Sequence, residues 1–217
     1  MATKKEAVGI IHKCAALYNE NLSGKNVLFV TIGKDSNVAC FEALFRKQNF
    51  MHLTGVKSNM NSEFFYKAAL NQRLSPSNIS FDSGGTSELK LEALSQLMSI
   101  HTTARIVGDY DNSSPLLITD KLAGTVTMTM GFVKVNDVYI PNTALKKDLR
   151  DISAQATRRK IAAIFTKPRN KTLYENLTYI AKDLTIDDDN LASVLSEKID
   201  KNTLTATFPI PRSISDS

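Results

Sequence analysis

The 217-residue sequence predicts an α+β fold in which N-terminal helices lead into a twisted antiparallel sheet. Two features of the chain indicate this class. Apolar side chains recur at helical spacing in the first hundred residues, and after residue 103 short β-branched or aromatic segments alternate with turn residues. The composition, 42% apolar and 23% charged, is typical of globular domains and excludes disordered or fibrous classes.

Three amphipathic segments predict helices. Residues 4–20 carry apolar side chains at every third or fourth position, and a second segment, residues 62–72, follows the candidate N-caps Asn61 and Ser62. The strongest signal covers residues 86–98. We expect Thr86 to cap this helix, and its core stripe consists of Leu91, Leu94, Leu97 and Met98.

Strand signals are concentrated in the second half of the chain. Residues 26–33 predict one early buried strand, and residues 158–167 predict a late one with basic ends. The sequence "VNDV" at 135–138 predicts a tight hairpin turn, because Asn and Asp tolerate positive φ. Residues 173–183 are ambiguous between helix and strand, and residues 187–199 predict a short helix.

The sequence "DLTIDDD" at 183–189 is the one candidate boundary. We therefore expect a single α+β domain over residues 1–182 and an acidic C-terminal appendage with a short helix over residues 183–217. The N-terminal residues show neither the apolar run nor the small-residue cleavage site of a signal peptide, and no apolar run approaches the roughly 20 residues of a membrane span. We therefore expect a cytoplasmic protein without a membrane partner. In that setting Cys14 and Cys40 are expected to be buried small hydrophobes.

Positive charge is concentrated in residues 144–171, which hold nine basic and two acidic side chains, while the whole chain carries +5. Such a block indicates a surface that binds nucleic acid, because Lys and Arg displace counterions from phosphates. Arg158, Arg159 and Lys160 at its centre are candidate substrate-binding residues. A solvated helix and strand edge would give the same pattern.

Metal and cofactor signals are weak. The three histidines, His12, His52 and His101, are far apart, and none has a ligand partner at the usual zinc spacing. "DSGGTS" before the helix at 86 lacks the Lys of a phosphate-binding loop and is better read as a turn before an N-cap. We therefore expect no metal and no cofactor.

A dispersed set of polar residues fits metal-free cleavage of RNA. In that reaction the 2′-OH attacks phosphorus, a base and an acid move protons, and cations stabilise the added charge. His52, expected late in a strand or in the turn after it, suits the base or acid. A structural hydrogen-bonding role for His52 stays open. The set comprises His52, Thr54, Lys67, Arg73, Lys90, Lys121, Asn142, Thr143 and Lys167.

The segments "NFMHLTGV", "FFYKAALNQRLSPSNI", "SELKLEALSQL", "LLITDKLAGTVTMTMGFV", "YIPNTALKKDLRD" and "RKIAAIFTK" follow one another in a familiar order. In this order and spacing the chain resembles the fourth of the phage Barnase/EndoU/colicin/RelE-like nuclease families. The resemblance runs from about residue 26 to 182. It implies helices leading into a sheet of about four or more strands, and a metal-independent ribonuclease that is toxin-like or acts in phage–host conflict.

The resemblance also implies a catalytic set, carried by the matching motifs "HLTG", "YIPNT" and "IFTK": His52, Thr54, Asn142, Thr143 and Lys167. Arg73 and Lys121 join as phosphate-binding candidates on charge grounds. The leading hypothesis is an endoribonuclease that leaves a 2′,3′-cyclic phosphate on single-stranded or loop RNA.

Two other functions stay open. The order of His52, Thr54 and a following helix is similar to the NAD-receiving strand of ADP-ribosyltransferases, for which Glu175 is the late acidic candidate. The third possibility is a catalytically inactive phage accessory module that binds nucleic acid or a phage or host protein.

Overall fold

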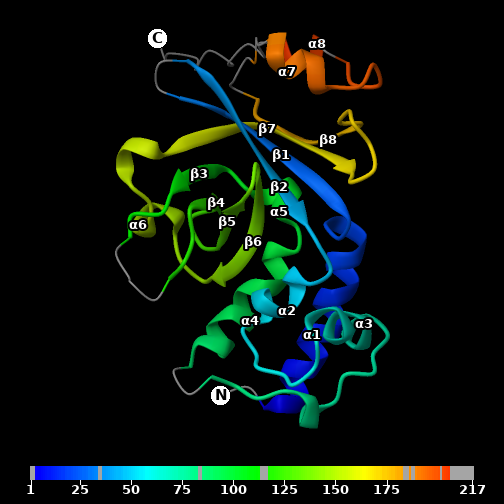
Figure 1. The fold of residues 1–217 in the computed structure, drawn as a ribbon. Helices are drawn as coiled ribbons and strands as arrows, with labels where there is room; N and C mark the ends of the chain where they lie inside the picture. Colours follow the sequence, from blue (N-terminus) through cyan, green and yellow to red (C-terminus); the bar gives the residue numbers. More distant parts are fainter. Residues whose placement is uncertain are drawn as a thin grey trace, which may run out of the picture.

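The computed structural model describes residues 3–33, 36–82, 85–112, 117–182, 186, 189–200 and 202–205 (Figure 1). The helices among these residues are α1 (Lys4–Asn21), α2 (Asn49–Thr54), α3 (Ser62–Leu70), α4 (Thr86–Leu97), α5 (Ile100–Thr103), α6 (Leu149–Ile152), α7 (Asp189–Val194) and α8 (Asn202–Thr205), with short 3-10 turns η1 (Pro76–Asn78) and η2 (Gln155–Thr157). The strands are β1 (Lys25–Ile32), β2 (Val38–Phe45), β3 (Ile106–Asp109), β4 (Lys121–Gly124), β5 (Thr129–Val135), β6 (Val138–Leu145), β7 (Arg159–Pro168) and β8 (Asn176–Ile180).

The sheet closes into a barrel. In the described part of the chain its order is β1-β2-β6-β5-β4-β3-β7, and β7 returns to pair with β1, so seven strands form the ring. β8 pairs with β7 beyond the ring. The α+β class is confirmed. The sheet has more strands than the four or so expected, because β1 and β2 join the later strands and close it, and it is not wholly antiparallel, because β2 pairs with β6 in parallel. Closure removes the exposed edges that an open sheet would leave.

Four helices cover one end of the barrel. Helices α1 to α4 pack on one another, and α2 and α4 also contact β6 (Figure 1). One continuous apolar core runs from the helices, where Tyr18 is buried, into the barrel, where Phe29, Phe41 and Phe132 are in contact. The Phe29 and Phe41 rings stack with centroids 4.7 Å apart. This aromatic packing fills the barrel interior below its open end.

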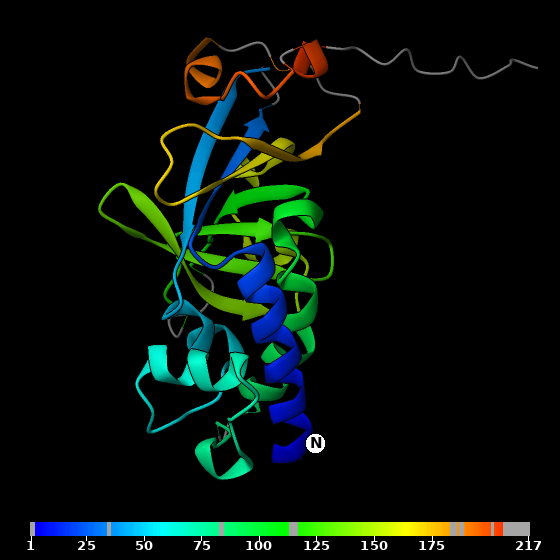
Figure 2. The same ribbon diagram turned by 90° about the vertical axis from the view of Figure 1, so that its right-hand side faces the viewer.

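The C-terminal segment covers part of the outside of the barrel. Leu28 on β1 and Phe165 on β7 face outward and are buried with Leu191, Leu195 and other C-terminal residues. Figures 1 and 2 show α7 and α8 on the far side of the barrel from α1 to α4. The described part of the predicted acidic appendage therefore packs on the barrel wall.

Most local predictions are confirmed. Helices form at α1, α3 and α4, and Asn61 caps α3 by accepting a 2.9 Å hydrogen bond from the Glu63 amide. The predicted stripe on α4 is buried. Its N-cap is Gly85 rather than Thr86, because a residue with φ of 72° precedes the first turn. The turn between β5 and β6 contains Asn136 at φ 55°, as predicted.

Three local predictions need correction or resolution. His52 lies in helix α2 rather than in a strand or turn, because Phe50 and Leu53 are buried three residues apart on one helical face and Gly55, at φ 69°, ends the helix. The ambiguous segment after residue 173 forms strand β8. Cys14 is buried as predicted, but Cys40 is exposed, because it points away from the barrel interior that Phe41 enters.

Among the described residues, no helix is both long and apolar enough to cross a membrane.

Candidate functional site at the mouth of the barrel

The end of the barrel away from α1 to α4 holds a polar cavity of about 330 Å³. Strands β1, β2, β3, β4 and β7 contribute to its wall. Mouths of barrels are common places for ligand sites, because side chains from several strands converge there. The lining residues are Thr31, Ala39, Cys40, Phe41, Val107, Asp109, Lys121, Ala156, Thr157 and Arg159.

An ion pair lies at the centre of this mouth. Lys121 on β4 and Asp109 on β3 are register partners, and the Lys121 ammonium donates to the Asp109 carboxylate. Both side chains keep some solvent exposure, 27% for Lys121 and 43% for Asp109. The Lys121 Nζ also lies 5.9 Å from the centroid of the Tyr139 ring. A charged ligand that enters the mouth can therefore reach both groups.

Arg159 supplies the second cation of the cavity. It is the first residue of β7, and its Nη1 donates to Asn37 Oδ1 at 2.6 Å and to the Asn37 carbonyl at 3.3 Å. These contacts hold the guanidinium beside the turn between β1 and β2. With Lys121 it gives the cavity two positive groups against one carboxylate, a balance suited to an anion.

Threonine hydroxyls fix the backbone around the ion pair. Thr157 Oγ1 accepts from the Asp109 amide at 2.8 Å and donates to the Ala154 carbonyl at 2.9 Å. The Ala154 amide in turn donates to the Asp109 carbonyl at 3.0 Å. On the opposite wall, Thr31 Oγ1 donates to the Ala39 carbonyl at 3.0 Å. Asp109 is thus held in place before any ligand arrives.

A family model described as phage-Barnase-EndoU-ColicinE5/D-RelE like nuclease 4 matches residues 10–183. The chain belongs to this nuclease-like family. The predicted resemblance is therefore confirmed over most of the sequence, and it indicates a nuclease-type domain that binds nucleic acid. Neither the search of curated proteins nor that of solved structures found a match.

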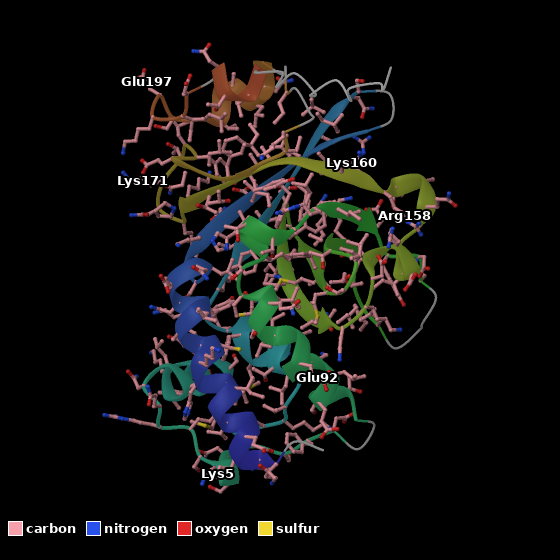
Figure 3. All side chains as sticks on the ribbon, turned by 180° about the vertical axis from the view of Figure 1, so that it is seen from behind. Lys5, Glu92, Arg158, Lys160, Lys171 and Glu197 are labelled. Atoms are coloured by element: carbon pink, nitrogen blue, oxygen red, sulfur yellow. The ribbon has the colours of Figure 1, made fainter. Side chains whose placement is uncertain are left out.

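Two of the sequence-predicted phosphate-binding residues of this nuclease-like domain, Lys121 and Arg159, meet at the mouth. Arg158 does not, because its guanidinium donates to Ser153 through Nε at 2.9 Å and Nη2 at 2.7 Å. Lys160 is exposed farther along β7 (Figure 3). Arg73 is exposed after α3, at the helical end of the molecule.

The basic block of residues 144–171 is divided among several surfaces. Lys146 pairs with Glu92 on α4, and Arg150 pairs with Asp148 at 2.6 Å. Figure 3 shows Arg158 and Lys160 on one side of the molecule and Lys171 on the other. Arg159 is the basic residue of this block that lines the mouth cavity.

The residues of "HLTG" and "YIPNT" serve different parts of the fold. His52 is exposed on α2, whereas Thr54 is fully buried and donates from Oγ1 to the Met51 carbonyl at 2.7 Å. Asn142 donates from Nδ2 to the Ile118 carbonyl at 2.8 Å, and Thr143 is buried opposite Gly131.

Lys167 lies on the outer wall of the barrel. Its Nζ donates to the Thr172 carbonyl at 2.8 Å, lies 4.5 Å from the Tyr174 ring centroid and 3.7 Å from a Glu42 carboxylate oxygen. Within the described chain no hydrogen bond or ion pair joins any two of His52, Thr54, Asn142, Thr143 and Lys167. Their shared catalytic role stays a prediction.

Asp109, Asp120 and Tyr139 are three mouth residues that sequence reasoning missed. Asp109 ends one strand signal, "ARIVGD", and Lys121 begins a later one, so a hairpin between these segments would have placed the two side chains together. Among the described residues, no group of three or more His, Cys, Asp or Glu side chains is arranged to hold a metal ion.

Proposed function

We propose that the chain is an endoribonuclease that cleaves RNA at the barrel mouth by attack of the 2′-OH, without a metal ion. The observation that carries the proposal is the meeting of Lys121, Arg159 and Asp109 in one cavity. Two cations can bind a phosphodiester and a carboxylate can move a proton, which together supply what this reaction needs. Membership of a nuclease-like family supports the same conclusion.

Phosphate binding and base activation are linked in this proposal. The Arg159 guanidinium can bind the two non-bridging phosphate oxygens, and the Lys121 ammonium can bind the bridging O5′. When the phosphate takes a hydrogen bond from Lys121, the Asp109 carboxylate loses part of its ion pair. It then becomes a stronger acceptor for the 2′-OH proton.

The chemical step moves two protons. Asp109 takes the proton of the 2′-OH as the bond from O2′ to phosphorus forms. The bond from phosphorus to O5′ breaks, and Lys121 donates a proton to the leaving O5′. The products are a 2′,3′-cyclic phosphate and a 5′-hydroxyl, and exchange with water restores Asp109 and Lys121. Arg159 stabilises the additional negative charge on phosphorus.

The substrate proposed is single-stranded or loop RNA, because a regular duplex holds its 2′-OH out of line with the leaving oxygen. The competing assignment keeps His52 as base or acid, with Thr54, Asn142, Thr143 and Lys167 around the phosphate. This competing assignment rests on motif order alone. Variants of its five residues therefore serve as comparators for variants of the mouth residues. A toxin-like role in phage–host conflict rests on the family resemblance.

The test uses an end-labelled RNA in EDTA, with the product ends identified by mass spectrometry. We expect 2′,3′-cyclic phosphate ends on the RNA and no cleavage of the same sequence with 2′-O-methyl riboses. Cleavage of the 2′-O-methyl strand, or products with 5′-phosphate ends, would contradict attack by the 2′-OH. Binding without cleavage of either strand would instead support an inactive nucleic-acid-binding module.

A further inference from the structure

A second cavity of about 270 Å³ adjoins the first, and we propose that it binds a nucleobase beside the reacting phosphate. We further propose that it favours bases with an amino group, namely adenine, cytosine and guanine, over uracil. The inference rests on the proposed function for the position of the phosphate.

The two cavities share Asp109 and Lys121. A strand whose phosphate contacts Lys121 from the first cavity therefore places an adjoining nucleoside at the second. The second cavity is slightly smaller than the roughly 300–1,000 Å³ of pockets for drug-sized ligands, which suits a single flat ring system.

Tyr139 provides an aromatic surface in the second cavity. Its ring is half-buried and is held by the Phe41 ring, whose centroid lies 5.3 Å away at an interplanar angle of 84°. Among the described residues the Tyr139 hydroxyl has no hydrogen-bond partner, so it can contact a ligand. Single-stranded nucleic acids commonly stack their bases on such side chains.

Asp120 supplies an oriented acceptor on the same wall. Its amide donates to the Phe132 carbonyl at 2.8 Å, and its carbonyl accepts from the Tyr110 amide at 3.1 Å. Its Oδ2 accepts from the Lys134 amide at 2.6 Å. Oδ1 has no hydrogen-bond partner in the described part of the chain, and an ionised carboxylate only accepts hydrogen bonds.

The charges of the two cavities differ in sign. Lys121 and Arg159 outnumber Asp109 in the first cavity, whereas Asp109 and Asp120 outnumber Lys121 in the second. A phosphate therefore favours the first cavity. The second favours a neutral group that donates hydrogen bonds, and this difference sets the direction in which the strand crosses the mouth.

Base identity then decides the fit to Asp120. Adenine, cytosine and guanine each carry an exocyclic amino group that can donate to Oδ1. Uracil carries carbonyl oxygens on both sides of its ring N–H, and these would face a carboxylate. The cavity should therefore discriminate against uracil.

Binding of non-cleavable RNA tests this inference apart from the chemistry. Fluorescence anisotropy would compare 2′-O-methyl hexanucleotides of adenine, cytosine and uracil on the full chain. We expect the uracil strand to bind about tenfold more weakly, because one hydrogen bond to a charged group is lost and a carbonyl faces the carboxylate. In Asp120→Asn the side-chain oxygen can still accept from Lys134, and the new amide can donate to uracil, so the preference should disappear or reverse.

Tyr139→Leu should weaken all three strands alike, by about 5- to 100-fold, because a stacking surface is lost. Asp137→Asn, an exposed turn residue with the same charge change, is the matched control and should keep the wild-type preference. Circular dichroism would confirm that each variant is folded. Equal wild-type affinity for the three strands, or an unchanged preference in Asp120→Asn, would overturn the base site.

The two proposals fail in different ways. A preference against uracil in a protein that cleaves no RNA would leave the base site standing and remove the proposed activity. Cleavage of RNA by a protein without any base preference in binding would do the reverse.

Discussion

Lys121 and Asp109 are register partners on β4 and β3, and their side chains form an ion pair on the boundary between the two mouth cavities. The pair is partly exposed, and such pairs stabilise a fold by no more than about 1 kcal/mol. Its two residues can therefore be replaced without unfolding the chain. This makes the mouth accessible to mutational tests of function.

Gly131 is expected to support the mouth through packing. A Cβ at this position would lie 2.6 Å from Thr119 Oγ1 and 2.7 Å from Thr143 Cγ2. Gly131→Ala should destabilise the fold by about 1–3 kcal/mol, because Thr119, which directly precedes Asp120 and Lys121, and Thr143 must move to make room for the new Cβ. Gly9→Ala on α1 is the control, because its Cβ would meet no atom within 4 Å and should stabilise the helix by up to about 1 kcal/mol. Urea denaturation would measure both, and equal stability of the two variants would contradict the packing argument.

Salt dependence reports phosphate contacts. For a single strand the slope of log affinity against log salt is about −0.7 for each phosphate neutralised. Lys121→Ala and Arg159→Ala should each make the slope shallower by about 0.7, while Lys147→Ala, an exposed lysine after β6, should leave it unchanged. Anisotropy titrations with 2′-O-methyl RNA at several salt concentrations would measure the slopes. An unchanged slope in both mouth variants would show that neither cation contacts phosphate.

The outer-wall cluster around Lys167 is expected to stabilise the fold. The Tyr174 hydroxyl and the Asn26 amide both donate to the Glu42 carboxylate, at 2.8 Å for Asn26. Tyr174→Phe should destabilise the fold by about 1–3 kcal/mol, because a half-buried carboxylate loses a donor. Tyr179→Phe is the matched control, since no hydrogen bond of its hydroxyl is seen among the described residues. Thermal unfolding would compare the stability of the two variants. An unchanged stability of Tyr174→Phe would mean that the hydrogen bond from Tyr174 to Glu42 adds nothing to stability.

Cys14 should make stability depend on alkaline pH. Burial raises the pKa of its thiol to about 11 from an ordinary value of 9.0. Between these values the unfolded chain loses the thiol proton while the folded chain keeps it, so the free energy of unfolding falls as pH rises from about 9 toward 11. Cys14→Ala should show a shallower fall in urea titrations at pH 8, 9 and 10. Identical pH profiles for the variant and the wild type would contradict this assignment.

Local patterns account for the elements that sequence reasoning predicted. Helices α1, α3 and α4 each carry an apolar stripe that the core buries, and the Asn136 turn needs a residue that tolerates positive φ. The motif order of the nuclease-like family was also recognisable from the chain alone. These signals lie within a few neighbouring residues or in an ordered series of motifs.

Barrel closure and the mouth depend on contacts between distant residues. β1 pairs with β7 across more than a hundred residues, for example Asn26 with Lys167, and no local pattern encodes that pairing. It places Lys167 on the outer wall, although its motif suggested a catalytic role. The pairing of β7 with β3, Val107 with Arg159, brings Arg159 to the cavity that Lys121 also lines. Helix α2 was missed because six residues give too short a periodic signal.

The most direct measurement is the single-turnover rate of RNA cleavage in EDTA for variants of the mouth and of the competing set. We predict that Lys121→Ala and Arg159→Ala each lower the rate by about 100-fold or more, the usual effect of removing one group that stabilises developing charge. His52→Ala and Lys167→Met should keep the wild-type rate, as should the Lys147→Ala control. A rate lost in His52→Ala but kept in Lys121→Ala would contradict a reaction at the barrel mouth.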